Sequence, residues 1–490
     1  MSLSVKHSNN NEITGIKADS RKISRGDIFV AIIGEHHDGA SFIKDAISKG
    51  AAAVLIDKKQ YSKDKFHSIN TVPILSTSSL SSVMATLANR VYDNPSKKMN
   101  VVGITGTNGK TTVCYLLESV FKAIGKNTGV IGTINYRYGN KIVAAPNTTP
   151  QSADLQSLLK EMHDNSVSNV FMEVSSHALS LNRVSGVDFD LAVFTNLTGE
   201  HLDFHKTMDD YFNAKKSLFT KYLAMNAKNS KKINKCAIIN SDDEWGKKLI
   251  ASITIPHLSY GIHKGSELCA HIAHSDVRGV SLEIEYNKKK YQLHIKLLGE
   301  HNVYNVLAAL GASIKLGLQP KEAIPGLRKL QSIPGRMERI TNKDKYDVIV
   351  DYAHTDDALG KALKCIRSLK PARIITVFGC GGNRDTDKRP RMGIIASKLS
   401  DWVVVTSDNP RDEDPRLIMN QIEQGIKSIN KNNYSLIEDR EEAIKCAINN
   451  AKCGDIILLA GKGHETCQII GDKRIDFDDR LIARKYIKKC

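Results

Sequence analysis

A glycine-rich stretch between an apolar strand and an apolar helix decides the fold, and it reads Met99-Asn-Val-Val-Gly-Ile-Thr-Gly-Thr-Asn-Gly-Lys-Thr-Thr112. Residues 99–105 have the apolar character of a buried strand, and apolar residues from 111 to 124 recur with helical spacing. Strand, glycine-rich turn and helix in this order are typical of an α/β domain with a mainly parallel sheet. The glycines let backbone N–H groups approach a phosphate, and the start of the helix adds positive potential.

The turn has the residues that a nucleoside triphosphate needs. Lys110 is placed to reach the β- and γ-phosphates, and the Thr111 hydroxyl to hold Mg²⁺. The strict phosphate-loop spacing requires glycine where Ile104 stands, whereas Gly103 lies one residue too early. An ordinary glycine-rich turn is the alternative, and the Lys-Thr pair at a helix start disfavours it. The predicted ATP-binding residues of this turn are Gly106, Thr107, Asn108, Gly109, Lys110, Thr111 and Thr112.

The flanking sequence predicts three domains, as the length of 490 residues also indicates. Pro95 follows an apolar helix pattern at 79–92 and would end that helix. After about residue 335, apolar strands alternate with helices, which predicts a doubly wound parallel sheet. We therefore expect an α/β fold with a small N-terminal domain, a central ATPase-like parallel-sheet domain and a C-terminal Rossmann-like domain, at 1–97, 98–333 and 334–490.

Composition excludes several protein classes. No apolar run reaches the roughly 18 residues that span a bilayer, and the first residues lack the apolar block of a signal peptide. The nine cysteines form no Cys-x-x-Cys pair, which disfavours a disulfide framework and a zinc ribbon and favours the cytoplasm. The formal net charge of +17 points to acidic partners, or only to a lysine-rich solvated surface.

Several separated motifs, taken in order, resemble the Mur ligase family, the ATP-dependent amide-bond ligases of bacterial cell-wall synthesis. The motifs are Gly103 to Thr112, Asn147-Thr-Thr149, Met172-Glu-Val-Ser-Ser-His177, Asn196 to His205, and Gly299-Glu-His-Asn302. The resemblance runs from about residue 13 to the end of the chain. It implies a first domain that binds a UDP-sugar, a central domain that binds ATP and a third domain that binds an amino acid.

Three motifs of the last block are similar to those of members that add meso-2,6-diaminopimelate. They are Gly379-Cys-Gly-Gly-Asn-Arg-Asp385, Asp408-Asn-Pro-Arg411 and Gly461-Lys-Gly-His-Glu465. The resemblance implies addition of this diamino acid to the D-glutamate carboxylate of UDP-N-acetylmuramoyl-L-alanyl-D-glutamate, with release of ADP and phosphate. Such a reaction supplies a peptidoglycan precursor, and so serves cell-wall growth, cell shape and cell division.

The chemistry of this reaction explains the cations. A carboxylate has no good leaving group, so ATP first converts it to an acyl phosphate, which the amine then attacks. The γ-phosphate and the carboxylate are both anions, and their approach requires Mg²⁺ and Lys110.

The resemblance also assigns metal ligands and a modified lysine. Glu173 would bind Mg²⁺ with Thr111, His201 would bind a second metal, and Lys215 would carry a carbamate (N6-carboxylysine) that binds Mg²⁺. Each assignment has a simpler alternative: an exposed strand-end Glu173, a satisfied structural network of His201 with Asp203 and His205, and a solvated helical Lys215. The adjacent Lys216 makes the lysine assignment ambiguous by one position.

Substrate contacts follow from the same resemblance. Ser20, within Asp19-Ser-Arg21, and the Glu35-His-His37 turn would face uridine, although Asp-Ser-Arg is also a common helix cap. The expected contacts to the muramoyl-dipeptide are Asn147, Thr148, Thr149, Ser175 and Arg183. Some relatives have Gln where this chain has Leu181. The remaining expected ATP contacts are His301, Asn302, Arg336 and Asp351.

The expected diaminopimelate site depends on a guanidinium. Arg411 follows a predicted strand, and its fork matches the distal carboxylate of meso-diaminopimelate. Relatives that add lysine, which lacks this carboxylate, have Ala at this place; the alternative is a solvated turn arginine. The full expected set is Arg384, Asp408, Asn409, Pro410, Arg411, Gly461 and Glu465, with Arg384 on a carboxylate and Glu465 on the distal ammonium.

Two other functions stay open from the residues. Folylpolyglutamate synthase shares the phosphate loop and the carbamylated lysine, but lacks the N-terminal UDP domain and the Asp-Asn-Pro-Arg loop. A basic ATP-gated nucleic-acid-binding protein would use the positive charge, but no nucleic-acid-binding motif supports it. The expected partners are therefore small molecules, with no nucleic acid and no membrane insertion, and a monomer is expected.

Overall fold

The computed structural model describes residues 13–33, 38–60, 71–224, 234–340 and 346–487. They divide into two compact units, which are treated separately below. The first unit comprises Met1–Cys269, Glu285–Lys289 and Tyr304–Leu327, and the second comprises Ala270–Ile284, Lys290–Val303 and Arg328–Cys490.

The N-terminal part of the first unit is a small parallel sheet with a helix on each face. Its order is β1-β2-β3-β4. Successive side chains of β2 point to opposite faces, so Phe29 packs with the α1 side and Ile28 with the α3 side. The elements are β1 (Gly15–Lys17), β2 (Asp27–Ala31), α1 (Ile43–Ser48), β3 (Ala53–Asp57), β4 (Ile74–Thr77) and α3 (Leu80–Val91), with short 3₁₀ turns at Ser20–Lys22, Gly39–Phe42 and Pro95–Lys98.

The central sheet has the parallel core that the sequence predicts. The strand order is β12-β11-β10-β5-β9-β6-β7-β8, in which β7 and β8 pair antiparallel at the edge. The strands are β5 (Asn100–Thr105), β6 (Thr128–Ile131), β7 (Asn135–Tyr138), β8 (Lys141–Ala144), β9 (Asn169–Glu173), β10 (Leu191–Phe194), β11 (Cys236–Asn240) and β12 (His257–Gly261). Because β5 lies between β9 and β10, the loops that follow these three strands meet at one edge.

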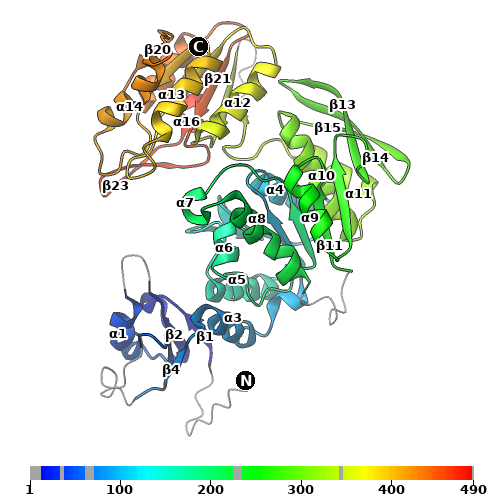
Figure 1. The fold of residues 1–490 in the computed structure, drawn as a ribbon, viewed down its shortest axis with the longest axis vertical. Coiled ribbons are helices and arrows are strands. Elements are labelled where there is room, and N and C mark those ends of the chain that lie inside the picture. Colours follow the sequence, from blue (N-terminus) through cyan, green and yellow to red (C-terminus); the bar gives the residue numbers. More distant parts are fainter. Residues whose placement is uncertain (1–12, 34–37, 61–70, 225–233, 341–345, 488–490) are drawn as a thin grey trace. The chain divides into compact units, whose positions relative to one another are not determined.

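Helices join these strands, and α5 packs against α3 of the small sheet (Figure 1). The helices are α4 (Lys110–Ala123), α5 (Ser152–Asp164), α6 (Ser176–Ser180), α7 (Leu202–His205), α8 (Met208–Ser217), α9 (Glu244–Ser252), α10 (Glu300–Lys315) and α11 (Pro320–Lys329). Helix α8 ends at Ser217, and the chain continues as a π-helical turn over Leu218–Leu223. The spacing of apolar residues in the sequence does not distinguish this π-helical turn from an α-helix, because both bury the same apolar side chains.

Strands β13 (Leu268–Asp276), β14 (Gly279–Tyr286) and β15 (Lys289–Ile295) extend the sheet beyond β12. Two-residue connections join them, and such short connections require antiparallel neighbours. These three strands are therefore antiparallel neighbours.

The second unit contains a doubly wound sheet of order β16-β17-β21-β18-β19-β20. All its neighbours pair parallel except the edge strand β16. One apolar cluster covers each face, with Phe378 in one and Val377 in the other. The elements are β16 (Glu338–Ile340), β17 (Asp347–Asp351), α12 (Asp356–Ser368), β18 (Ile374–Phe378), α13 (Lys388–Leu399), β19 (Trp402–Val405), α14 (Pro415–Lys427), β20 (Tyr434–Leu436), α15 (Arg440–Asn449), β21 (Ile456–Ala460), the hairpin β22 (Cys467–Ile470) and β23 (Lys473–Asp476), and α16 (Asp479–Ile487).

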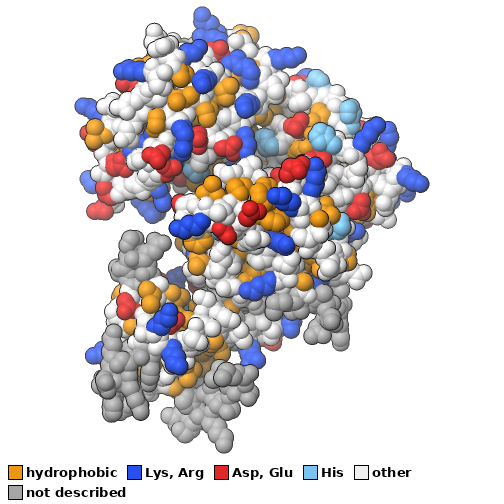
Figure 2. All heavy atoms as spheres, viewed as in Figure 1, with side chains coloured by type: hydrophobic (Ala, Val, Ile, Leu, Met, Phe, Trp, Pro, Cys, Tyr) orange, Lys and Arg blue, Asp and Glu red, His pale blue; other side chains and the backbone are white. Residues whose placement is uncertain are grey.

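The described surface carries mixed charge. On the face shown in Figure 2, Lys and Arg side chains are interspersed with Asp and Glu. Among the described residues, no helix is both long enough and apolar enough to cross a membrane.

A buried ion pair ties α15 to α16 in the second unit. Arg440 and Asp479 are both fully buried at the side chain and lie 2.7 Å apart. Asp479→Ala would leave the guanidinium buried and unpaired, so we expect a loss of about 3–5 kcal/mol of unfolding free energy. Denaturant unfolding followed by Trp402 fluorescence, in a Trp245→Phe background, measures this unit. The exposed Asp476→Ala serves as the control, and equal effects of the two substitutions would contradict the prediction.

Candidate active site

The turn after β5 has the backbone of a phosphate loop. Gly106 has φ 142° and Gly109 has φ 89°, both in the region that disfavours side chains. A Cβ on Gly106 would lie 1.9 Å from the Thr195 hydroxyl, and one on Gly109 would lie 2.3 Å from the Asn305 amide oxygen. Glycine is therefore required at both positions, as the sequence predicts, and α4 begins directly after the second.

Two lysines converge on the first glycine of this loop. The Lys110 Nζ donates to the backbone oxygens of Gly106 and Thr107, each at 2.8 Å. The Lys215 Nζ, from α8, donates to the same Gly106 oxygen at 2.9 Å. The loop thus brings together two cations that the sequence places 105 residues apart.

Lys215 is buried, which excludes the solvated alternative. Its side chain is 1% exposed, whereas the adjacent Lys216 is half-buried. The Lys215 Nζ also lies 4.5 Å from the centre of the Tyr211 ring. Burial, and then the nearby charge of Lys110, lower the pKa of Lys215 far below its ordinary value. A shift in this direction favours the neutral, nucleophilic form of the amine.

Thr111 and Glu173 meet at the end of β9. The Thr111 hydroxyl donates to Glu173 Oε1 at 2.9 Å, and Glu173 is 1% exposed, so it is not the exposed strand-end residue of the simpler alternative. Thr133 donates to the same carboxylate through its backbone N–H and its hydroxyl. Sequence reasoning missed Thr133. The preceding residue, Gly132, leaves room for the Glu173 carboxylate, since a Cβ at position 132 would lie 2.3 Å from Glu173 Oε1.

His201 lies in a histidine and aromatic cluster. Its ring centre is 4.9 Å from that of His177 and 6.0 Å from that of Tyr211, and its Nε2 is 3.9 Å from Glu200. His201 and Lys215 therefore both contact Tyr211. The network alternative for His201 is thus correct in part, but the partners are His177 and Tyr211.

The expected dipeptide contacts gather around Thr149. Its hydroxyl donates to the Glu173 backbone oxygen at 2.8 Å and accepts from the Ser175 N–H at 3.1 Å. Arg183 Nη1 donates to the Thr149 oxygen at 3.4 Å, and within the described residues the buried Arg183 Nε has no hydrogen-bond partner. The hydroxyls of Thr148 and Thr133 share a hydrogen bond, which links Thr148 to the Glu173 site. The Tyr136 hydroxyl donates to the backbone oxygen of Asn147.

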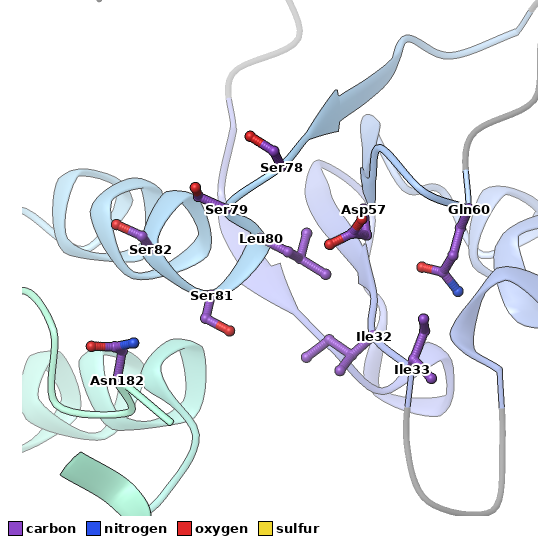
Figure 3. A pocket seen from close by; sticks show the side chains of 10 residues that line it. All are labelled: Ile32, Ile33, Asp57, Gln60, Ser78, Ser79, Leu80, Ser81, Ser82 and Asn182. Atoms are coloured by element: carbon purple, nitrogen blue, oxygen red, sulfur yellow. The ribbon is translucent and has the colours of Figure 1, made fainter. Parts of the chain in front are cut away.

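A separate cavity of about 480 Å³ lies beside the N-terminal sheet (Figure 3). Its lining comes from the ends of β2, β3 and β4, the first turn of α3, and Asn182: Ile32, Ile33, Asp57, Gln60, Ser78, Ser79, Leu80, Ser81, Ser82 and Asn182. Ser20 is not part of this lining; it is buried in a 3₁₀ turn that Asp19 caps by accepting from the Arg21 N–H. Leu181 is exposed, and the Glu35-His-His37 turn lies outside the described residues.

The other expected ATP residues lie in the second unit. Asn302 is buried and its amide donates to the Leu298 oxygen, whereas His301 is exposed at the start of α10. Asp351 accepts from the N–H groups of Met337 and Ala353, and burial raises its pKa. Arg336 lies over the Tyr352 ring, 5.0 Å from its centre.

The expected diaminopimelate residues other than Arg384 lie close together on adjoining loops of the second unit. The Asn409 amide donates to Glu465 Oε2 at 2.9 Å. Arg411, at φ 53°, donates through Nη1 to the Gly382 oxygen at 2.7 Å, so it is anchored to the preceding loop. Asp408 and Pro410 are buried, and a Cβ on Gly461 would lie 3.4 Å from the Asp408 carboxylate. Arg384 is exposed on the Gly382 loop.

Two buried cations that support these loops were missed by sequence reasoning. Arg389 pairs with Glu413, which also accepts from the Asn383 N–H beside Arg384. Lys462 contacts both Asn409 and Glu465. The sequence did offer a signal for Lys462: it lies between two expected diaminopimelate contacts, Gly461 and Glu465, in Gly461-Lys-Gly-His-Glu465.

Comparisons with known proteins cover nearly the whole chain. Residues 12–92 match the Mur ligase family catalytic domain, 104–313 the Mur ligase middle domain, and 335–463 the Mur ligase glutamate ligase domain. The UDP-N-acetylmuramoyl-L-alanyl-D-glutamate–2,6-diaminopimelate ligase of Clostridium botulinum is 41% identical over 487 residues, covering 98% of this chain and 96% of the relative.

Solved structures of Mur ligases are also similar to this chain. A structure of UDP-N-acetylmuramoyl-L-alanyl-D-glutamate–2,6-diaminopimelate ligase aligns with a TM-score of 0.69 at 31% identity, covering 97% of this chain and 95% of that one. The MurF ligase of Thermotoga maritima in complex with ADP shares the fold, with a TM-score of 0.66 at 19% identity and 98% coverage of both chains. The three domain matches in order, and the full-length relative, show that this chain belongs to the Mur ligase family.

Proposed function

We propose that this protein is the ATP-dependent ligase that adds meso-2,6-diaminopimelate to the D-glutamate carboxylate of UDP-N-acetylmuramoyl-L-alanyl-D-glutamate. The observation that carries the proposal is the connected set around Asn409. It holds an acid, Glu465, and a guanidinium, Arg411, on adjoining loops. An amino-acid head group, with one ammonium and one carboxylate, needs this pair of opposite charges.

The phosphate loop would bind ATP and stabilise the negative charge of the γ-phosphoryl group during its transfer. Its backbone N–H groups and the start of α4 face the phosphates, and Lys110 turns from the loop oxygens to the β- and γ-phosphates. The acceptor carboxylate, held by Thr149, Ser175 and the unpartnered Arg183 Nε, attacks the γ-phosphate. An acyl phosphate and ADP result, and the amine then displaces phosphate.

Thr111 and Glu173 would hold Mg²⁺, which neutralises phosphate charge when bound. The residues fit because Mg²⁺ in nucleotide sites commonly takes one or two protein oxygens, with phosphates and waters for the rest. The Thr111 hydroxyl and the Glu173 carboxylate already lie 2.9 Å apart beside the loop. His201, whose ring lies close to that of Tyr211, would bind a second metal ion.

A carbamate on Lys215 is part of the proposal. Carbon dioxide adds to a neutral amine, and burial lowers the pKa of Lys215, which is the direction that favours this form. The modification turns a buried cation into a bidentate anion, which adds a metal ligand next to the phosphate loop.

The UDP-sugar is proposed to bind in the cavity beside the N-terminal sheet. Serine hydroxyls and the N-terminus of α3 line one wall and suit a diphosphate (Figure 3). Asp57 lines the same cavity and would accept from a ribose hydroxyl or a ring N–H. Asn182 contributes an amide one residue after Leu181, which stands where some relatives have Gln.

Arg411 should decide which amine is used. Lysine leaves the guanidinium without its carboxylate, so we expect wild-type discrimination on the order of 1000-fold or more. Arg411→Ala should lose most activity with meso-diaminopimelate, while the already slow use of lysine falls far less. The measurement is the ratio of kcat/KM for the two amines.

The exposed Arg416→Ala, on the first turn of α14, is the matched control and should keep the wild-type ratio. An unchanged ratio in Arg411→Ala would show that Arg411 is not the discriminator, and Arg384 would be tested next.

A cytoplasmic monomer completes the proposal. The cysteines of the described residues are free, as in a reducing compartment.

ADP release from ATP and UDP-N-acetylmuramoyl-dipeptide, with and without meso-diaminopimelate, tests the function. Release that requires the diamino acid supports it. Release that instead follows glutamate addition to a folate would favour folylpolyglutamate synthase.

A further inference from the structure

Lys462 is a fully buried lysine at the centre of the expected diaminopimelate residues. Its Nζ donates to Asn409 Oδ1 at 3.2 Å, to Glu465 Oε2 at 3.1 Å and to the Cys467 backbone oxygen at 2.7 Å. An ammonium has three donors, and all three are used. Lys462 therefore has one defined position.

These contacts fix the orientation of the Asn409 amide. Its Oδ1 accepts from Lys462 and also from the Ile469 N–H at 3.0 Å. The amide oxygen is thus committed to these two donors, and its NH₂ group faces Glu465, to which it donates at 2.9 Å. Lys462 and Asn409 together hold Glu465 by its Oε2. Within the described residues, Glu465 Oε1 makes no hydrogen bond.

The charges of the cluster leave one negative charge for a ligand. Asp408 and Glu465 are acids, and Lys462 lies 3.6 Å from the first and 3.1 Å from the second. The nearby Arg440 is already matched by Asp479. Asp408 is buried, and its Oδ1 has no hydrogen-bond partner among the described residues. Two acids and one unmatched lysine leave a formal charge of about −1, which a substrate ammonium would balance.

We propose that Lys462 is a positioning residue of the amine site: it holds Glu465 and Asn409 so that Glu465 Oε1 and Asp408 Oδ1 receive the distal ammonium of the diamino acid. Lys462 acts through these residues and does not touch the substrate, because its own donors are occupied. The inference rests on the proposed function, which supplies the diamino acid.

Lys462→Met tests the proposal, since it keeps most of the side-chain length and removes the ammonium. We expect KM for meso-diaminopimelate to rise at least about 10-fold, because a misplaced ligand group weakens every contact it makes. KM for ATP and for the UDP-substrate should stay within about two-fold, because those groups bind elsewhere. The exposed Lys473→Met, on the neighbouring hairpin, is the matched control and should change none of the three.

A double-mutant cycle separates positioning from simple support of the fold. If Lys462 acts through Glu465, then Lys462→Met should raise KM for the diamino acid much less in a Glu465→Gln background than in wild type. A purely structural role would lower kcat without a selective rise in KM for the diamino acid. The effect of Lys462→Met would then be equal in the wild-type and Glu465→Gln backgrounds. Equal effects, or an unchanged or lower KM for the diamino acid, would overturn the proposal.

Lys462→Arg covers the case in which Lys462→Met fails to fold. Arginine keeps the charge, but its planar fork cannot bond the three oxygens as one ammonium does, so KM for the diamino acid should rise to an intermediate value. Failure of both variants to fold would overturn the positioning role in favour of a structural one. A wild-type enzyme that does not use meso-diaminopimelate would instead contradict the proposed function.

Discussion

Lys110→Ala is expected to lower the rate of ADP release by roughly 100- to 1000-fold. The substitution removes the cation at the transferring phosphate, and a contact of this kind contributes about 3 to 4 kcal/mol to transition-state stabilisation. The Lys110 ammonium lies within the loop, 2.8 Å from the Gly106 and Thr107 oxygens, so it needs only a local movement to reach a bound phosphate. Steady-state kinetics of ADP release measure the effect.

Lys126→Ala is the control for this experiment, because Lys126 is exposed beyond the other end of α4. The control should keep the wild-type rate. Both variants should unfold at the wild-type denaturant concentration, which separates lost catalysis from lost structure. A folded Lys110→Ala enzyme with near-normal ADP release would remove Lys110 from the mechanism.

Lys215→Ala is expected to reduce activity by about 100-fold or more, on the scale of other charged groups at a phosphoryl-transfer site. Small carboxylates such as acetate should restore part of the activity, because an added anion can take the place of the carbamate. Lys216→Ala should have a mild effect, because that side chain is half-buried and, within the described part of the chain, makes no hydrogen bond to the Gly106 oxygen.

The pair of variants also decides the register of the resemblance. A strong effect of Lys216→Ala with a mild effect of Lys215→Ala would show that the lysine assignment is wrong by one position. Failure of every small carboxylate to rescue Lys215→Ala would argue against the carbamate. The loss of activity would then be attributed to the unmodified amine of Lys215.

The phosphate loop could be predicted from the sequence because its determinants are local. Gly106, Gly109 and Lys110 act through backbone conformation and a helix start, and both are set within a few residues. The alternating strands of the second unit were predictable for a similar reason, since buried parallel strands have short apolar runs. The structure confirms the strand, turn and helix order of the loop and the alternation of strands and helices in the second unit.

Residues that act through distant partners could not be predicted in this way. The side chain of Lys215 looks solvated in its own helix, and only contact with Gly106 shows that it is buried. Thr133 reaches Glu173 across 40 residues, and Lys462 reaches Asn409 across 53. Such contacts depend on which strands lie side by side, and local spacing carries no record of that. Motif order predicted a role for Lys215 but indicated none for Thr133 or Lys462.

The most direct test of the account is mass spectrometry of the UDP-linked product formed from ATP, UDP-N-acetylmuramoyl-L-alanyl-D-glutamate and an equimolar mixture of meso-diaminopimelate and lysine. Competition for one enzyme makes the product ratio equal to the ratio of kcat/KM for the two amines at early times. The account predicts a product that carries one diaminopimelyl residue, one ADP for each product, and lysine adducts rarer by a factor on the order of 1000. A product that carries mainly lysine, or ADP release without any amide product, would contradict it.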